Sequence, residues 1–83
     1  MSEYTVYIIF SDELNRYYVG QTENFENRLE HHNQGRNKYT SKGAPWKFIH
    51  KIVVIDRSAA ILLESKIKKR GIKRFLDDIK FGM

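Results

Sequence analysis

The chain has 83 residues, which is short enough that we expect one domain, residues 1–83, with one hydrophobic core. It contains no cysteine, which excludes a disulfide framework or a thiolate site and suits a reducing, cytoplasmic location. The N-terminus lacks the pattern of a signal peptide, and no apolar run approaches the roughly 20 residues that span a bilayer. We therefore expect no membrane partner.

The net charge is +5, and the basic residues form one group in the middle of the chain and another near its end. Aromatic residues are interleaved with the first group. Such a surface favours a polyanion such as nucleic acid, although a basic surface also serves solubility alone. The candidate nucleic-acid-binding residues from this pattern are Lys38, Tyr39, Lys42, Lys47 and Lys68.

Residues 4–20 predict a β-hairpin, because two apolar, β-branched runs flank a polar connector. Successive strand residues point to opposite faces. If Val19 packs with the apolar face of the first run, Tyr7 and Tyr18 lie together on the other face, and Gly20 lies beside them. A glycine there would let a ligand backbone approach. Two phenols and a glycine on one face predict a site.

The remaining chain predicts three helices and one more strand. In order, these are a helix from residue 25 to 33–35 capped by Thr22 or Asn24, a loop over 35–45, a strand over 46–55, a helix from 56–58 to Gly71, and a helix over 72–79. The C-terminal half of the third strand is apolar on both faces, which predicts a strand covered on both sides. The order β-β-α-β-α-α indicates an α/β protein of the α+β type, with a three-stranded antiparallel or mixed sheet flanked by helices.

Arg28 and His32 are one helical turn apart, so their side chains are neighbours. Taken alone, the pair is better explained as part of an exposed polar face. His31 and His32 also suggest a metal, but adjacent residues of a helix point about 100° apart, which disfavours a shared zinc ion.

Glu64 borders the apolar stripe of the second predicted helix. A carboxylate there needs a partner, either Lys68 at i+4 or a bound cation. A lone carboxylate holds Mg²⁺ when waters and substrate phosphate complete the octahedron. The phenols, arginine, histidine and carboxylate together are the groups that phosphodiester hydrolysis requires.

The sequence resembles the GIY-YIG nuclease domain family, in particular its small stand-alone members. The first family motif corresponds to Thr5-Val6-Tyr7 and the second to Tyr18-Val19-Gly20. Residues 25–33 are similar to the arginine-bearing helix of the family, and residues 58–64 to its glutamate-bearing helix. The resemblance covers essentially the whole chain.

This resemblance implies a metal-dependent endonuclease with one active site per chain, acting on DNA, with branched or damaged DNA as a candidate substrate. It implies that Tyr7 is the general base or positions the water, and that Tyr18 hydrogen-bonds the nucleophile or phosphate. Arg28 would stabilise the phosphate charge and His32 would assist proton transfer. Glu64 would bind Mg²⁺ or Mn²⁺. A tyrosine base has a reference pKa of about 10, so we expect Arg28 and the metal to lower it.

The sequence departs from the family at several positions, among them Val6 and Val19, which replace isoleucines conservatively. Thr5 replaces the glycine of the first motif, and Gln21, which we include among the nucleic-acid-binding candidates, stands where some members have a lysine. Two alternatives to a nuclease are a non-catalytic nucleic-acid-binding module and a scaffold whose tyrosines are simply packed. We expect no appended DNA-binding domain, in which case targeting would come from a partner protein or from substrate shape. The sequence does not specify an oligomeric state.

Overall fold

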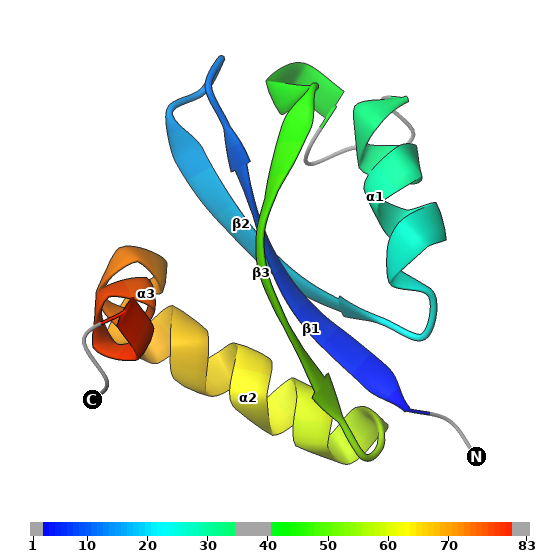
Figure 1. The fold of residues 1–83 in the computed structure, drawn as a ribbon, viewed down its shortest axis with the longest axis vertical. Coiled ribbons are helices and arrows are strands. Elements are labelled where there is room, and N and C mark those ends of the chain that lie inside the picture. The colour runs from blue at the N-terminus through cyan, green and yellow to red at the C-terminus, as the bar shows by residue number, and fades with distance from the viewer. Residues whose placement is uncertain (1–2, 35–40, 81–83) are drawn as a thin grey trace.

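The computed structural model describes residues 3–34 and 41–80 and contains a three-stranded antiparallel sheet with helices on both faces (Figure 1). The elements are β1 (Tyr4–Ser11), β2 (Arg16–Thr22), α1 (Phe25–Asn33), a short 3₁₀ helix (Ser41–Gly43), β3 (Trp46–Val54), α2 (Arg57–Arg70) and α3 (Ile72–Lys80). The strand order is β2-β1-β3, with β1 in the centre. The predicted element order and the α+β class are confirmed.

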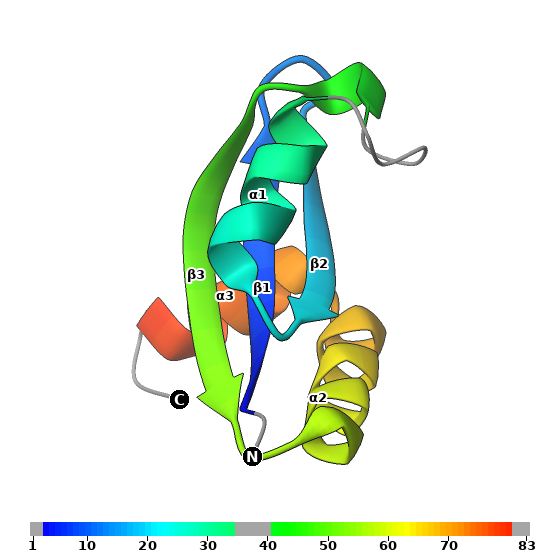
Figure 2. The ribbon, with the colours of Figure 1, turned by 90° about the vertical axis from the view of Figure 1, so that its right-hand side faces the viewer.

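The two faces of the sheet carry separate apolar clusters. In Figure 2, α1 lies in front of the sheet and α3 lies behind it. The α1 face buries Tyr7, Ile9 and Trp46, and the face toward α2 and α3 buries Val6, Ile8, Val19, Ala60 and Ile67. Each face therefore has its own core, whereas a single core was expected.

The register of the hairpin determines which face each tyrosine occupies. Tyr7 pairs with Gly20, and Ile9 pairs with Tyr18. Because side chains alternate along a strand, Tyr7 and Tyr18 lie on the α1 face, while Val19 packs with Val6 and Ile8 on the other. The expected placement of the two phenols on one face is confirmed.

The third strand contains a β-bulge that sequence alternation did not predict. Ile8 pairs with His50 but Ile9 pairs with Phe48, so Ile49 is an extra residue in β3. Trp46 and Phe48 therefore face α1. After the bulge, the even-numbered residues His50, Ile52 and Val54 face α2 and α3 instead.

The prediction that the C-terminal half of β3 is covered on both sides is wrong. β3 is an edge strand, and Val53 is 53 % exposed. The first residue of α1, Phe25, packs on Phe48, with ring centroids 5.4 Å apart, and lies beneath the Lys51 ammonium. The helix thus covers the first half of β3 and leaves Val53 open.

Polar caps set the helix ends. The Asn24 side chain accepts a hydrogen bond from the Asn27 N–H at the start of α1, and Asp56 does the same for Ala59 in α2. Gly71 ends α2 with a φ of 95°, a conformation that favours glycine. The helix α1 ends at Asn33 with Gln34 as its C-cap, and the predicted cap signal Gly35 lies outside the described residues. Within residues 3–34 and 41–80, no helix is long and apolar enough to cross a membrane.

Candidate active site

Tyr7 and His32 are the two most deeply buried of the candidate residues. The Tyr7 side chain is 1 % exposed, and its Oη lies 2.9 Å from His32 Nε2. The ring also lies across Gly20, where an added Cβ would meet Tyr7 Oη at 2.6 Å. The space above Gly20 is therefore filled by Tyr7 itself. This corrects the expectation that the glycine admits a ligand backbone.

Tyr18 lies beside this pair and is only partly buried. Its ring centroid is 6.4 Å from that of Tyr7, 5.2 Å from that of His32 and 6.1 Å from that of Trp46. The four rings form one aromatic cluster under α1. Because Tyr18 is the more accessible phenol, it is the one placed to meet a ligand directly.

The helix α1 sends Arg28 and His32 to different depths. His32 is fully buried against the sheet, so for this residue the exposed-face explanation is wrong. Arg28 is partly exposed and lines a surface pocket. The helix has this orientation because Phe25 packs on Tyr7, with ring centroids 5.5 Å apart, at its first turn.

Asn33, which the sequence did not single out as functional, ties the end of α1 to the start of β3. Its Nδ2 donates to the Trp46 carbonyl at 3.3 Å, and the Trp46 N–H donates to its Oδ1. One amide thus pairs with both backbone groups of an edge-strand residue. The signal was available, since an asparagine directly after His32 ends the helix that must hold that histidine in place.

Glu64 and Lys68 form the ion pair that the i+4 spacing predicts, with Nζ 2.8 Å from Oε2. The carboxylate side chain is 18 % exposed, and the lysine is 60 % exposed. Glu64 opens into a pocket of about 420 Å³, lined by Gln21, Ile61, Glu64, Ser65, Lys68 and Lys69.

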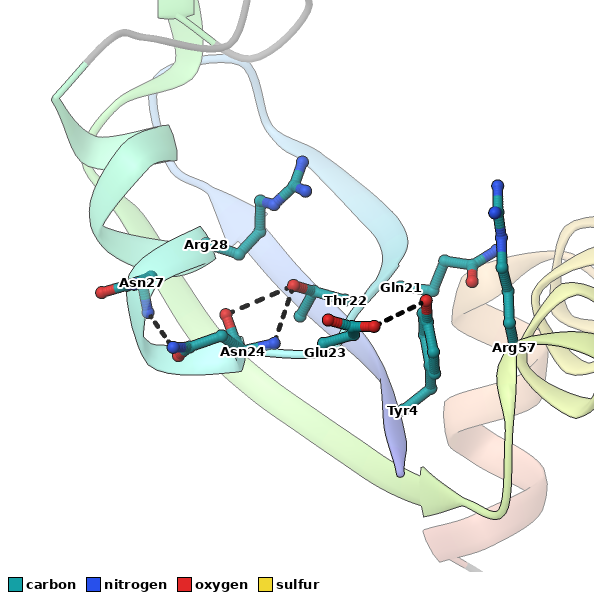
Figure 3. A pocket seen from close by; sticks show the side chains of 8 residues that line it. All are labelled: Tyr4, Gln21, Thr22, Glu23, Asn24, Asn27, Arg28 and Arg57. Carbon is teal, nitrogen blue, oxygen red and sulfur yellow. Dashed lines mark hydrogen bonds between the residues drawn. The ribbon is translucent and has the colours of Figure 1, made fainter. Parts of the chain in front are cut away.

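Arg28 opens into a second, larger pocket of about 610 Å³. It is lined by Tyr4, Gln21, Thr22, Glu23, Asn24, Asn27, Arg28 and Arg57 (Figure 3). Gln21 belongs to both linings, so the two pockets adjoin at this residue near the end of β2. The structure therefore places Arg28 and Glu64 on either side of Gln21.

Burial dominates the ionisation of both phenols. It raises the pKa of Tyr7 above its ordinary value; Tyr18 and Glu64 raise it further, and Arg28 opposes them. Burial also raises the pKa of Tyr18, as does Glu64, while Lys68 and Arg28 lower it. The expected net lowering of the Tyr7 pKa is wrong for the protein alone, because burial outweighs Arg28. Arg28 and Glu64 nevertheless both act on the pKa of each phenol, so both charged groups lie near the two phenols.

The residues of the smaller pocket suit a hard divalent cation. Gln21 Oε1 is buried and has no hydrogen-bond partner in the part of the chain that the structure describes. It lines the same pocket as Glu64, which gives two oxygen donors of the kind that Mg²⁺ prefers. No cluster of three or more His, Cys, Asp or Glu residues occurs among residues 3–34 and 41–80. A cation here would therefore keep several water or phosphate ligands.

The predicted nucleic-acid-binding residues are only partly brought together. Gln21 and Lys68 line the pockets, while Lys42 and Lys47 are exposed but belong to neither lining. Lys47 instead forms an ion pair with Asp12. Lys38 and Tyr39 lie outside the described residues. Arg57 and Lys69 line the pockets but were not predicted.

Comparison with known proteins identifies the family of this chain. A family model described as "GIY-YIG catalytic domain" matches residues 3–74. The chain belongs to the GIY-YIG domain family. This confirms the resemblance found in the sequence and indicates an endonuclease-type function with nucleic acid as the substrate class.

The relatives of this GIY-YIG domain include small proteins of similar length. It is 37 % identical over 82 residues to a UPF0213 protein of Syntrophus aciditrophicus (strain SB), covering 96 % of this chain and 93 % of that protein. The fold is similar to the solution NMR structure of a UPF0213 protein from Bacillus halodurans, with a TM-score of 0.58 and 20 % identity, over 95 % of this chain and 84 % of the other. At that identity, the likeness to the NMR structure concerns the fold alone.

Proposed function

We propose that this GIY-YIG domain is a divalent-metal-dependent endonuclease that hydrolyses phosphodiester bonds in DNA, with branched or damaged DNA as its substrate in repair or recombination. The observation that carries the proposal is the buried hydrogen bond between Tyr7 Oη and His32 Nε2, set within electrostatic reach of Arg28 and Glu64. It supplies a proton acceptor beside a cation and a carboxylate. A cytoplasmic location and a targeting partner stay predictions from the sequence.

Tyr7 and His32 act together on the attacking water. The raised pKa keeps the Tyr7 phenol protonated near neutral pH. With His32 in its Nδ1–H tautomer, the phenol O–H donates to Nε2, 2.9 Å away. As the water oxygen bonds to phosphorus, the water proton passes to Tyr7 Oη and the phenol proton passes to Nε2. The bond from phosphorus to the leaving oxygen breaks, and that oxygen takes a proton from solvent. The final acceptor is an imidazole, whose reference pKa of about 6.5 is near physiological pH, so no phenolate is needed.

Tyr18 and Arg28 hold the phosphate. The guanidinium donates to the non-bridging oxygens, where negative charge grows in the transition state. The partly exposed Tyr18 hydroxyl donates to the phosphate or orients the water. Both side chains leave the Tyr7–His32 hydrogen bond undisturbed.

Glu64, with Gln21 Oε1 beside it, would hold Mg²⁺ or Mn²⁺. The bound cation supplies Lewis-acid stabilisation of the phosphoryl charge. Lys68 must release the Glu64 carboxylate for this to happen. That exchange is feasible because the lysine is largely exposed and such ion pairs contribute only about 0–1 kcal/mol.

The test is a cleavage assay on duplex, flap, junction and single-stranded DNA with Mg²⁺ or Mn²⁺. We expect metal-dependent cutting that is lost in Glu64→Ala and strongly reduced in Tyr7→Phe. Cutting that survives both substitutions would come from a contaminant and would contradict the proposal.

The second candidate function is a non-catalytic nucleic-acid-binding module. The Glu64–Lys68 ion pair favours it, because the carboxylate already has a partner. Salt-sensitive DNA binding without cutting under either metal would support this function, whereas no DNA binding at low salt would contradict both and leave a scaffold role.

A further inference from the structure

The larger pocket has two arginines on opposite walls. Arg28 comes from α1 and Arg57 from the first turn of α2, and Figure 3 shows both extending toward the same side, with Gln21 between them. Neither guanidinium forms an ion pair or hydrogen bond with another of the described residues. Two cations without a partner across an open pocket favour a bound anion.

The acidic group of this pocket does not cancel that charge. Glu23 accepts a hydrogen bond from Tyr4 Oη at 3.1 Å, which holds the carboxylate against the pocket edge. Burial and Glu23 raise the pKa of the Tyr4 phenol and Arg57 opposes them, so the charge of Arg57 acts at the same place. The remaining lining is amide and hydroxyl, and with two arginines against one glutamate the net charge is positive.

The position of Arg57 is fixed by the fold. Asp56 caps α2 through the Ala59 N–H, and Arg57 follows it as the first helical residue. Arg28 and Arg57 therefore come from helices on different faces of the sheet and meet at the end of β2.

We propose that this pocket is a second phosphate subsite, in which Arg57 binds the phosphodiester adjacent to the one that is hydrolysed. The inference rests on the proposed nuclease function and adds a path for the substrate strand. The strand runs from the Arg57 pocket, past Gln21, into the pocket of Glu64 and Lys68. Arg28 lies between the two phosphates and serves the reacting one. Arg57 is thus a substrate-positioning residue, distinct from the groups that act on the water.

The first test measures binding without cleavage, in a Glu64→Gln background, by fluorescence anisotropy of a labelled flap DNA over a range of salt concentrations. Arg57→Ala should weaken binding about 5- to 20-fold and reduce the slope of log affinity against log salt by about 0.7–0.9. Arg57→Lys should restore the slope but only part of the affinity, because a lysine does not contact phosphate in a bidentate way. The matched control is Arg16→Ala, which removes the same charge from an exposed position at the opposite end of β2.

The second test locates the phosphate. After the cut position is mapped, a single neutral methylphosphonate replaces the phosphate next to it, on either side in turn. At one of these positions the KM of the otherwise wild-type protein should rise about tenfold, with kcat largely unchanged. For Arg57→Ala, the same methylphosphonate should cause no further rise in KM. If removal of a terminal 5′-phosphate abolishes the Arg57 effect instead, the subsite binds chain ends and the assignment to an internal phosphodiester is wrong.

These outcomes separate the two claims. If the protein cuts DNA, but Arg57→Ala binds DNA with the same affinity and the same salt dependence as Arg16→Ala, only the subsite is overturned. A wild-type protein that neither binds nor cuts DNA overturns the proposed function itself. Circular dichroism of each variant checks that the exposed substitution has left the fold intact.

Discussion

The phenol of Tyr7 lies across the backbone of Gly20, its partner on the neighbouring strand. A Cβ built on Gly20 would be 2.6 Å from Tyr7 Oη and 2.8 Å from Tyr7 Cζ. Real Cβ atoms essentially never approach so closely. The tyrosine of the first family motif and the glycine of the second are therefore two halves of one cross-strand contact, and the glycine is required for space.

Gly20→Ala should displace the Tyr7 ring. We expect a loss of about 1–3 kcal/mol in the free energy of unfolding, typical of overpacking a core, and a large loss of cleavage activity. Urea denaturation gives the first quantity. The double variant Tyr7→Ala/Gly20→Ala is the control, because Gly20→Ala should cost much less when the ring is absent. Equal costs in both backgrounds would show that the contact does not restrict residue 20.

Tyr7→Phe tests the hydrogen bond without removing the ring. The substitution deletes only Oη, so the contacts with Tyr18 and Phe25 persist. We expect a loss of about 0.5–1.5 kcal/mol in stability and of about 10²–10⁴ in kcat, measured by denaturation and single-turnover cleavage. If Tyr7→Phe keeps the wild-type kcat, Tyr7 takes no part in proton transfer.

Stability should fall at high pH because of the buried phenols. The folded state raises the pKa of Tyr7 and Tyr18, so these groups stay protonated there while the unfolded chain ionises them near pH 10. Their contribution is complete below pH 10 and is lost as pH rises above it, because the unfolded state then binds fewer protons. For Tyr7, the more deeply buried phenol, the expected slope is about −1.4 kcal/mol per pH unit, and Tyr18 adds to it in the same direction. Denaturation from pH 8 to 11.5 measures it, and Tyr7→Phe should give a shallower slope; equal slopes would contradict the assignment.

Glu64 and Lys68 should have opposite effects on metal binding. Glu64→Gln removes the anionic ligand, so calorimetric titration with Mn²⁺ should show binding weakened at least tenfold. Lys68→Ala frees the carboxylate from its 2.8 Å ion pair and should strengthen Mn²⁺ binding a few-fold, while it weakens DNA binding. Neither variant should lose more than about 1 kcal/mol of stability, because the lysine is exposed. Unchanged Mn²⁺ affinity in Glu64→Gln would place the cation elsewhere.

Local patterns predicted the elements and the shared face of the phenols, because alternation along the hairpin determines which side each tyrosine occupies. The β-bulge at Ile49 was not predicted, because strict alternation was assumed along the whole strand and the extra residue is revealed only by the pairing with β1. The exposure of Val53 was missed for a related reason. How far along β3 the helix α1 extends depends on tertiary packing.

The candidate site residues were chosen by side-chain chemistry and by the family resemblance. The features that were missed depend on how deeply a side chain is buried and on which elements pack beside it. His32 looked like part of a polar helix face, but the burial of its ring is determined by the sheet below it. Arg57 carried no signal because its place in the pocket depends on the start of α2 lying next to the end of β2. Arg28 and a metal together were expected to lower the pKa of Tyr7; in the protein alone the pKa is raised, because the burial of the phenol outweighs the charge of Arg28.

Asn33→Ala should loosen the attachment of α1 to the sheet and, through it, the position of His32. The Asn33 amide contacts both the N–H and the carbonyl of Trp46, so its removal takes away two hydrogen bonds from an edge strand. We expect a loss of about 1–3 kcal/mol in stability and faster amide exchange at Trp46. Asn33→Asp keeps the acceptor for the Trp46 N–H and loses only the donor, so it should show roughly half the loss. Hydrogen exchange followed by NMR measures the exchange rate of the Trp46 amide in both variants. If Asn33→Ala lowers kcat while leaving KM for DNA unchanged, Asn33 acts through the Tyr7–His32 pair; an equal rise in KM alone would instead indicate a disturbed DNA surface.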